Sequence, residues 1–271
     1  MPEKPEVITV VNSLKPKLIG KKILSSEVYW DNIIEYPSVS VFKKEIKNEK
    51  INNITTRGKW LVFSLDTYYL LIHLRMEGKF FFRTKKDEKN KYEHVFFNLD
   101  DNTQLRFADV RKFGKMHLIK KEDIDKVGPL KDLGYEYYDY NLTNNYLKDK
   151  FSKKKLPIKT VLLDQSIIAG IGNIYDDEIL FMSKINPYKK ACDITLKECN
   201  LIIKNTRIVL EKAIEKGGST IKSYTSSEGV HGLFQEELLV HTKKICPKCG
   251  SSIKKDKING RGTYYCPKCQ L

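Results

Sequence analysis

The stretch CPKCGSSIKKDKINGRGTYYCPKC, residues 246–269, decides the fold of the C-terminal part of the chain. It contains two Cys-x-x-Cys pairs that are separated by sixteen residues, namely Cys246, Cys249, Cys266 and Cys269. Two pairs at this spacing bring four thiolates around one tetrahedral ion, which is the pattern of a structural zinc ribbon. We therefore expect one structural Zn²⁺ here and not a disulfide. The other two cysteines, Cys192 and Cys199, are interpreted as ordinary thiols.

The residues between the two cysteine pairs predict a β-hairpin. Asn259-Gly260 is a dipeptide typical of a two-residue hairpin turn. This turn would place Arg261 at the hairpin tip, where its guanidinium can reach a phosphate. Zinc ribbons bind DNA, RNA or proteins, so the ribbon alone does not identify the partner.

The composition of the chain favours a polyanionic partner. Lys and Arg outnumber Asp and Glu by 49 to 34, which gives a formal charge of +15 over 271 residues. Such an excess is typical of nucleic-acid-binding proteins, although a coding bias toward Lys, Asn and Ile explains it equally well. The seven arginines are more informative, because four of them lie in loop motifs where Lys does not replace a planar, forked cation. These four are Arg57, Arg75, Arg111 and Arg261.

The sequence shows neither the pattern of a membrane helix nor that of a signal peptide. No apolar run reaches the roughly 20 residues of a membrane helix. The start, MPEKPEV, is not followed by the apolar segment of a signal peptide. We therefore expect a cytoplasmic protein without a membrane partner.

Hydrophobic periodicity divides the chain into regions and predicts the α+β class. Residues 5–18 have apolar side chains at helical spacing, with prolines at the helix entrance. Residues from 22 to about 120 contain short strands broken by polar turns, which predicts a sandwich or barrel. Helical periodicity follows in 143–165, 174–184, 194–216 and parts of 217–236. The expected regions are a β-domain with an N-terminal helix (1–132), a linker (133–145), a helical domain (146–236) and the zinc finger (237–271).

A glycine-rich turn, Gly170-Ile-Gly172-Asn173, separates two of the helical segments. A turn that opens a new helix offers backbone N–H groups and a positive dipole to a phosphate, and Asn173 adds a side-chain donor. Such turns also serve merely to let two helices pack closely. Four lysines upstream have two interpretations as well, either lining the same groove or being simply solvated: Lys153, Lys154, Lys155 and Lys159.

Two loops of the β-domain combine an apolar residue, an arginine and a glycine. They are HLRMEG, residues 73–78, and DVRKFG, residues 109–114. Loops of this kind suit a wedge that enters a base stack. For either loop standing alone, the interpretation of Met76 and Phe113 as core residues at strand ends is the favoured one. His73 and His94 are likewise explained as core or surface histidines.

Taken together, these motifs resemble the formamidopyrimidine-DNA glycosylase family, and the resemblance covers the whole chain. The matching segments also occur in the family's order: Met-Pro2-Glu3-x-Pro5-Glu6-Val7, Arg57-Gly58-Lys59, HLRMEG, DVRKFG, AGIGNIY at 169–175, and the zinc ribbon with GRGT at 260–263. The resemblance implies an N-terminal β-sandwich, a helix–two-turns–helix domain and a zinc finger. It also implies a monomeric bacterial repair enzyme that binds duplex DNA containing oxidised bases or abasic sites.

The resemblance implies a bifunctional reaction, base excision followed by strand cleavage. Pro2 would become the N-terminal residue after removal of Met1, and its secondary amine would attack the sugar C1′ to give a cationic iminium. Glu3 would act as general acid or base, and Glu6 would be a second acid near the site. Lys59 would contact phosphate and assist β-elimination, while Arg261 would bind phosphate and support δ-elimination.

The remaining implied residues contact DNA. Met76, Arg111 and Phe113 would fill the gap left when the damaged nucleotide flips out, with Arg111 facing the orphaned cytosine. The resemblance assigns further DNA contacts to His73, His94, Lys154 and Asn173. This set favours oxidised purines, such as 8-oxoguanine and formamidopyrimidines, over the oxidised pyrimidines preferred by the related endonuclease VIII branch. A catalytically inactive zinc-containing DNA-binding protein is the other alternative, and Pro2 with Glu3 speaks against it.

The chain departs from the family pattern at three positions. Lys4 replaces an apolar residue and would add a cation near the nucleophile, which would favour a neutral amine. Ile8 replaces a glutamate, so the hydrogen bonds behind Glu3 are in doubt, and His241 replaces an aromatic residue before the zinc ribbon. The Ser-, Thr- and Gly-rich segment 217–234 is expected to include the loop that caps the lesion.

Overall fold

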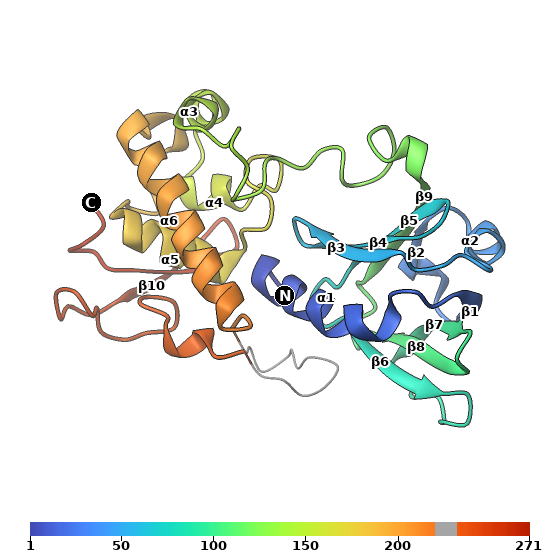
Figure 1. Ribbon diagram of the computed structural model, residues 1–271. Coiled ribbons are helices and arrows are strands. Elements are labelled where there is room, and N and C mark those ends of the chain that lie inside the picture. Colours follow the sequence, from blue (N-terminus) through green and yellow to red (C-terminus); the bar gives the residue numbers. More distant parts are fainter. Residues whose placement is uncertain (220–231) are drawn as a thin grey trace. The chain divides into compact units, whose positions relative to one another are not determined.

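The computed structural model describes residues 1–219 and 232–271, which form two compact units (Figure 1). Unit 1 comprises residues 1–131 and Gly232, and unit 2 comprises residues 132–219 and 233–271 of the described chain. The expected lesion-capping loop lies largely outside the described residues, since these leave out 220–231. No helix within the described ranges is long and apolar enough to cross a membrane.

Unit 1 begins with the predicted amphipathic helix, α1 (Lys4–Leu18), which has a proline in its first turn. The helix has one apolar stripe, because its apolar residues recur every three to four positions. This stripe is buried in the core of unit 1 and consists of Val7, Val10, Val11, Leu14 and Leu18.

Two β-sheets complete the described part of unit 1. One has the strand order β1-β7-β8-β6, formed by Ile23–Val28, Glu93–Leu99, Thr103–Ala108 and Lys79–Thr84. The other has the order β2-β9-β5-β4-β3, formed by Ile34–Tyr36, Lys115–Lys120, Tyr68–His73, Trp60–Ser64 and Asn53–Arg57. Apolar side chains of both sheets and of α1 share one core. The predicted sandwich with an N-terminal helix is therefore confirmed.

Some elements of unit 1 differ from the expectation of strands alone between residue 22 and about 120. A short helix, α2 (Val39–Glu45), and the 3-10 helix η1 (Asp31–Ile33) interrupt the strands, and η2 (Lys121–Asp123) follows them. The alternating sequence of α2 resembles a strand, but only Phe42 of this helix is buried. A single anchoring side chain is enough to hold such a short helix on the core and leaves little periodicity to detect.

Unit 2 is helical around a core of its own. Its helices are α3 (Asn144–Ser152), α4 (Ile158–Leu162), α5 (Asn173–Ser183) and α6 (Leu196–Glu215), with the 3-10 helices η3 (Ala191–Asp193) and η4 (Phe234–Glu236). The helical segment expected at 143–165 is interrupted between Ser152 and Ile158. The cause is Pro157, because a proline disfavours helical backbone at the residue before it and cannot donate a helical N–H.

The C-terminal part of unit 2 is the predicted hairpin. β10 (Lys254–Ile258) pairs antiparallel with β11 (Arg261–Tyr265), and the last pair, Ile258 with Arg261, leaves Asn259-Gly260 as the turn. Both turn residues have positive φ, 44° and 81°, as a type I′ turn requires. β11 packs on α5. The hairpin is thus anchored to the helix that begins at Asn173.

Candidate functional site

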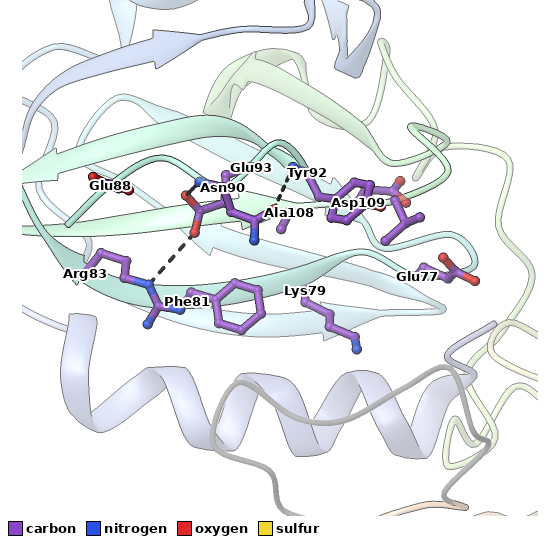
Figure 2. Close-up of a pocket in the computed structure, with 11 residues that line it drawn as sticks. Glu77, Lys79, Phe81, Arg83, Glu88, Asn90, Tyr92, Glu93, Ala108 and Asp109 are labelled. Carbon is purple, nitrogen blue, oxygen red and sulfur yellow. Dashed lines mark hydrogen bonds and ion pairs between the residues drawn. The ribbon is translucent and has the colours of Figure 1, made fainter.

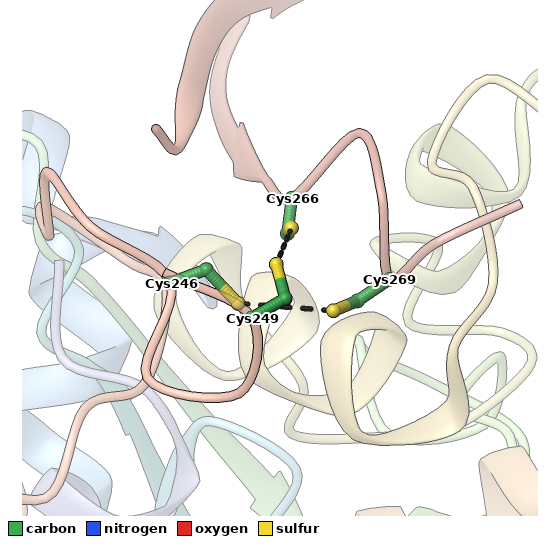
Figure 3. A group of neighbouring side chains, drawn as sticks. All are labelled: Cys246, Cys249, Cys266 and Cys269. Carbon is green, nitrogen blue, oxygen red and sulfur yellow. Dashed lines mark hydrogen bonds between the residues drawn. The ribbon is translucent and has the colours of Figure 1, made fainter. Parts of the chain in front are cut away.

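The four cysteines of the ribbon converge in space (Figure 3). Their sulfur atoms all lie within 4.8 Å of one another. The Cys246 and Cys269 sulfurs are 3.8 Å apart, and the Cys249 and Cys266 sulfurs are 3.5 Å apart. Four thiolates at about 2.3 Å from a tetrahedral Zn²⁺ lie about 3.8 Å from each other, so the donor set fits this ion. The four-cysteine metal site predicted from the spacing is confirmed as a cluster.

The hairpin presents Arg261 beside the start of α5. Arg261 is exposed at the first position of β11. The next residue accepts a hydrogen bond, because the Asn173 side-chain amide donates to the Gly262 carbonyl at 2.8 Å. The Asn259 amide donates to the Thr160 hydroxyl at 3.0 Å. These bonds hold the hairpin tip against α4 and the N-terminus of α5, two elements that are distant in sequence.

A buried ionic network lies beneath this surface. The Lys159 ammonium is 2.7 Å from Asp177 and 3.5 Å from Asp176, and all three side chains have 0% exposure. Lys159 also donates to the Asn173 carbonyl at 3.0 Å. The expectation that Lys159 is either solvated or on a groove surface was wrong. Its apolar neighbours on α4 bury the position, and two carboxylates compensate the charge.

Asp177 extends the network to the zinc module. Its second oxygen is 2.6 Å from His241 Nδ1 and accepts the Tyr264 backbone N–H at 3.2 Å. The imidazole also packs against the Tyr264 ring, with 4.8 Å between the centroids. His241 therefore makes both a ring contact and a polar bond in this chain. Asp177 was not predicted from the sequence, because an aspartate on a buried helix face has no periodic signature.

The adjacent Glu178 fixes the chain that leads to the ribbon. Its carboxylate accepts three backbone N–H bonds, from Leu239, Val240 and His241, at 2.8, 3.0 and 2.8 Å. Burial raises the pKa of Glu178, while these backbone donors lower it. Consecutive carboxylates of α5 thus tie the helix to the zinc module.

The exposed lysines of the predicted groove behave differently from Lys159. Lys153 and Lys155 are exposed. The Lys154 ammonium is partly exposed and lies 3.2 Å from an Asp164 oxygen. The glycine turn that follows is organised by Gln165, which accepts from Gly170 N at 3.0 Å and donates to the Ile171 carbonyl at 2.9 Å. A side chain, and not helix packing alone, determines the conformation of this turn.

In unit 1, charged groups gather around the N-terminus of α1. The helix begins after Glu3, whose backbone N–H donates to Glu6 Oε2 at 2.8 Å. This acceptor is present although position 8 is Ile, so the bond behind Glu3 does not need an acid there. Burial lowers the pKa of the Met1 amine, and the charge of Lys59 lowers it further, whereas the carboxylates of Glu3, Glu6 and Glu77 raise it. The structure therefore brings the predicted catalytic groups Glu3 and Lys59 to the same amine.

The β3–β4 turn is the element that places Lys59. Arg57 pairs with Trp60, so Gly58 and Lys59 form the two-residue turn. α1 packs on β3, and the Lys4 ammonium donates to the Thr56 hydroxyl at 2.9 Å. The expected effect of Lys4 on the nucleophilic amine stays a prediction. Its side chain is buried and directed to β3, and the charge effects assigned to the amine come from Glu3, Glu6, Lys59 and Glu77.

His73 is a neutral imidazole at the end of β5. Its Nδ1 accepts the Arg75 backbone N–H at 2.9 Å, and its ring packs edge-on against Trp60 with 4.9 Å between the centroids. Burial, together with the charges of Arg75 and Lys59, lowers the pKa of His73 to about 3. Because Nδ1 is an acceptor, the proton of the neutral ring is on Nε2, which is left as a donor.

The loop of residues 109–114 is organised by its first residue, Asp109. The buried carboxylate accepts from Arg111 N at 3.0 Å, from Phe113 N at 2.8 Å and from Gly114 N at 2.7 Å. A Cβ on Gly114 would lie 2.6 Å from the Phe107 ring, so only glycine fits there. An Asp at the start of a tight loop commonly binds its backbone, a sequence signal that we did not use for Asp109.

His94 supports the same loop from beneath. It is buried, and its Nε2 lies 3.0 Å from the Asp109 carbonyl. Burial lowers the pKa of His94, although the bond to Asp109 raises it, so Nε2–H of the neutral ring donates to the carbonyl. These contacts are those of a structural histidine, one of the two alternatives that the sequence left open.

The apolar and cationic residues of the two loops are accessible. Phe113 is 49% exposed, and the Arg111 guanidinium lies over its ring at 4.8 Å from the centroid. Met76 is partly exposed, in the loop after β5. Their exposure leaves these side chains able to contact a partner. The alternative that Phe113 is a core residue is therefore wrong.

A cavity of about 340 Å³ lies beside this loop, on the β6–β8 sheet (Figure 2). It is lined by Lys79 and Phe81 of β6, by Tyr92 of the connection to β7, and by Val110 of the loop itself. Its buried carboxylates already have partners within unit 1. Glu93 is 3.0 Å from Arg106, and Asp109 binds the loop backbone as described above. The cavity is therefore a hollow behind the loop and offers no preformed set of ligand contacts.

Comparison with known proteins covers both units. The model of the formamidopyrimidine-DNA glycosylase N-terminal domain matches residues 1–116, that of its H2TH domain residues 133–225, and that of the zinc finger found in FPG and IleRS residues 244–271. The formamidopyrimidine-DNA glycosylase of Exiguobacterium sibiricum is 46% identical over 273 residues, covering 100% of this chain and 99% of that protein. The enzyme of the same name from Bacillus subtilis is 45% identical over 276 residues, with coverage of 100% and 99%.

Solved structures of the Lactococcus lactis enzyme share the fold. A variant in complex with DNA containing Fapy-dG aligns with a TM-score of 0.92, at 36% identity and covering 100% of both chains. A complex with DNA containing an abasic site aligns with a TM-score of 0.91, at 37% identity and covering 99% of both chains. The family and fold inferred from the sequence motifs are thereby confirmed. The chain belongs to the formamidopyrimidine-DNA glycosylase family and is a DNA glycosylase and AP lyase with a C-terminal zinc finger.

Proposed function

We propose that this enzyme removes oxidised purines, 8-oxoguanine and formamidopyrimidines, from duplex DNA and then cuts the strand by β,δ-elimination. The observation that carries the proposal is the N-terminal group of unit 1. There, burial and the Lys59 ammonium lower the pKa of the Met1 amine, and the carboxylates of Glu3, Glu6 and Glu77 raise it, so that four charged groups act at the start of the chain. An amine with a lowered pKa is available as a nucleophile near neutral pH.

The proposed nucleophile is Pro2, exposed as a secondary amine once Met1 is removed. Attack of its nitrogen on the sugar C1′ breaks the glycosidic bond, and the base leaves with a proton. Glu3 serves as the acid or base at the opened sugar. Loss of the ring oxygen from C1′ gives an iminium, since a secondary amine cannot form a neutral imine. This cation accepts the electron pair of the C2′–H bond when that proton is removed, which gives an enamine. The enamine then expels the 3′ phosphate, which leaves with the electron pair of its bond to C3′.

The remaining proposed contacts bind the DNA backbone. Lys59 and Arg261 would bind phosphates next to the lesion and assist the β- and δ-steps. Asn173 would add a phosphate contact, because one of its two amide hydrogens is used by Gly262 and a carboxamide has two. Lys154 would contact phosphate from its partly exposed position. His73 would donate from Nε2, since its Nδ1 is already an acceptor.

The proposed lesion preference depends on Met76, Arg111 and Phe113, which would fill the space left by the flipped nucleotide. The exposed Phe113 ring and the Arg111 guanidinium stacked on it support this role. We further propose that the metal is one Zn²⁺ and that the enzyme acts as a monomer on chromosomal DNA. An oxidised pyrimidine is the second candidate substrate, because one structure of the L. lactis enzyme holds DNA that contains one.

A cleavage assay with lesion oligonucleotides tests the proposal. Duplexes with 8-oxoguanine, a formamidopyrimidine, an oxidised pyrimidine or an abasic site opposite cytosine are incubated with the wild-type enzyme and with Glu3→Gln. We expect the wild type to cut the two purine lesions faster than the pyrimidine lesion, with products of β,δ-elimination. Glu3→Gln should suppress base excision without unfolding the protein. Faster cutting of the pyrimidine lesion would select the second candidate, and an absence of cleavage would contradict the proposal.

A further inference from the structure

The segment that follows β1 supports the wedge loop, the name used here for residues 109–114. Trp30 lies between β1 and η1 and is 36% exposed. The Lys112 ammonium is 3.9 Å from the centroid of its ring. A cation at this distance over an indole is attracted by the negative face of the ring, and Trp is the best aromatic partner for it. The tip of the wedge loop is therefore held by a residue outside the loop motif.

Lys112 is also the residue of the wedge loop with an unfavourable backbone conformation. Its φ is 57°, a left-handed value that residues with a Cβ rarely adopt. Its backbone N–H donates to the Asp109 carbonyl at 3.2 Å. Such a conformation persists only where the surrounding contacts impose it. Asp109 provides contacts from within the loop, and Trp30 provides one from outside.

A second contact joins the same segment to the end of the wedge loop. The Lys115 ammonium donates to the Asn32 carbonyl at 2.9 Å and lies 2.8 Å from a Glu35 oxygen. Lys112 and Lys115 thus flank Phe113 and are both held by residues 30–35. This arrangement fixes the direction in which Phe113 and Arg111 project.

We infer that Trp30 is a positioning residue that fixes the wedge loop through Lys112 and thereby sets the discrimination for the base opposite the lesion. The inference rests on the proposed function, in which Arg111 faces the orphaned base. Hydrogen bonding to a base edge depends steeply on the position of the guanidinium, so a looser loop reads the base less selectively. Trp30 acts only through Lys112 and has no role in the chemistry at the sugar.

The neighbouring residue pair offers a matched control. The Lys89 ammonium lies 4.6 Å from the centroid of the Tyr29 ring, so it makes the same kind of contact one residue earlier in the chain. Lys89 belongs to the connection between β6 and β7, and not to the wedge loop. Removing the Lys89 contact deletes one surface charge and one cation–π contact while leaving the contacts of the wedge loop in place.

The experiment measures excision rates for 8-oxoguanine opposite cytosine and opposite adenine. For Trp30→Ala and Lys112→Met we expect the preference for cytosine to fall by about two- to fivefold, the size of one exposed cation–π contact. Trp30→Phe and Lys112→Arg should retain most of the preference, because each keeps a π face or a cation. Lys89→Met should retain all of it. AP-lyase activity on a single-stranded abasic oligonucleotide should be unchanged in every variant, since no base stands opposite.

A double mutant separates positioning from direct contact with DNA. Trp30→Ala combined with Lys112→Met should lower the preference no further than either change alone, because the two residues act as a pair. Additive losses, or a loss of affinity that is equal for both opposite bases, would overturn the inference. The inference would also be overturned if Trp30→Ala kept the full preference of the wild type for cytosine over adenine opposite the lesion. A wild type that cleaves no lesion duplex would instead contradict the proposed function, and the inference would fall with it.

Discussion

The two units hold their charged groups in opposite ways. In unit 2, Lys159 and Asp177 are completely buried and 2.7 Å apart, and Asp177 also binds His241 and Tyr264 of the zinc module. In unit 1, Arg111 projects from a loop and rests on the exposed ring of Phe113. The buried network of unit 2 lies next to the zinc module, whereas the guanidinium of the wedge loop in unit 1 is exposed, although unit 1 also has a buried pair of its own in Arg106 and Glu93.

We infer from this difference that unit 2 mainly binds DNA, whereas unit 1 carries out the chemistry and determines the base selectivity. A buried ion pair tolerates only the arrangement that satisfies it, so the network of unit 2 makes the start of α5 and the zinc hairpin one rigid surface. The groups of unit 1, namely the terminal amine and the wedge loop, must approach a nucleotide that leaves its stack. They are therefore placed on a terminus and on loops, and in the wedge loop Arg111 and Phe113 remain exposed. We expect substitutions in unit 2 to change stability and overall affinity, and those in unit 1 to change chemistry and selectivity.

Removal of the metal should have the largest effect on unit 2. Cys249→Ser deletes one of the four thiolates, and we expect loss of the ion, unfolding of the ribbon and loss of DNA binding. Metal content by atomic spectroscopy and DNA affinity by fluorescence anisotropy measure both consequences. Cys192→Ser is the control, since Cys192 lies outside the four-cysteine cluster. Stoichiometric zinc and full affinity in Cys249→Ser would show that the cluster is not the structural site.

Breaking the buried ionic network of unit 2 should have the second-largest effect, a loss of stability. Lys159→Met leaves the carboxylates of Asp176 and Asp177 buried without their cation, a change that typically costs about 3–5 kcal/mol of unfolding free energy. Lys189→Met is the control, because Lys189 pairs with Glu198 at 2.7 Å near the surface, where such pairs contribute about 0–1 kcal/mol. Urea denaturation of both variants provides the comparison. Equal costs would mean that the buried network does not make unit 2 rigid.

Loss of the proposed phosphate contacts should lower DNA affinity by a smaller amount, and equally for damaged and undamaged duplexes. Asn173→Ala and Lys154→Ala should weaken binding to damaged and undamaged duplexes alike, and Lys154→Ala should reduce the salt dependence by a slope of about one. Lys154 lies 3.2 Å from Asp164, so part of its charge is already compensated. Arg111→Ala should behave differently from these two variants, because it should reduce the selectivity for the base opposite the lesion and not the overall affinity. If affinity falls equally for all opposite bases in Arg111→Ala, then Arg111 is only a phosphate clamp.

The smallest expected effect concerns the protonation of His73. Its pKa of about 3 lies below the ordinary 6.5, because of burial and the charges of Arg75 and Lys59. The unfolded chain therefore binds this proton more tightly, so folding is undisturbed above pH 6.5 and loses stability as the pH falls from 6.5 toward 3. The His73 ring resonance in NMR should show a neutral imidazole from pH 8 to 5. A titration midpoint near 6.5 would contradict the buried environment.

The sequence motifs predicted most of the fold because they are local. The Asn259-Gly260 turn, the cysteine spacing and the apolar stripe of α1 each depend on a few neighbouring residues and on backbone geometry. The burial of Lys159 was not predictable in this way, because the compensating Asp177 follows eighteen positions later on another helix. Lys4 was missed for the same reason, since its partner, Thr56, lies on β3.

The sequence was a better guide to which residues are functional than to which residues contact and support them. Glu3 and Lys59 were expected near the Pro2 amine, and in the structure their charges act on the amine of the preceding residue, Met1, so their roles at Pro2 stay a prediction. The support of the wedge loop was not expected, because it comes from Asp109, His94 and Trp30 through a carboxylate, a carbonyl and a ring face. Contacts of this kind have no fixed spacing in the sequence, so only the folded chain shows them.

The central claim, that the terminal amine of unit 1 is the nucleophile, is tested most directly by trapping. Borohydride added during the reaction with lesion DNA should reduce the iminium and leave the protein covalently attached to the strand. Peptide mass mapping should then locate the adduct on Pro2, in a protein from which Met1 has been removed. An adduct on Lys59 would contradict the assigned roles, and full excision without any adduct, with Met1 still in place, would contradict the nucleophile itself.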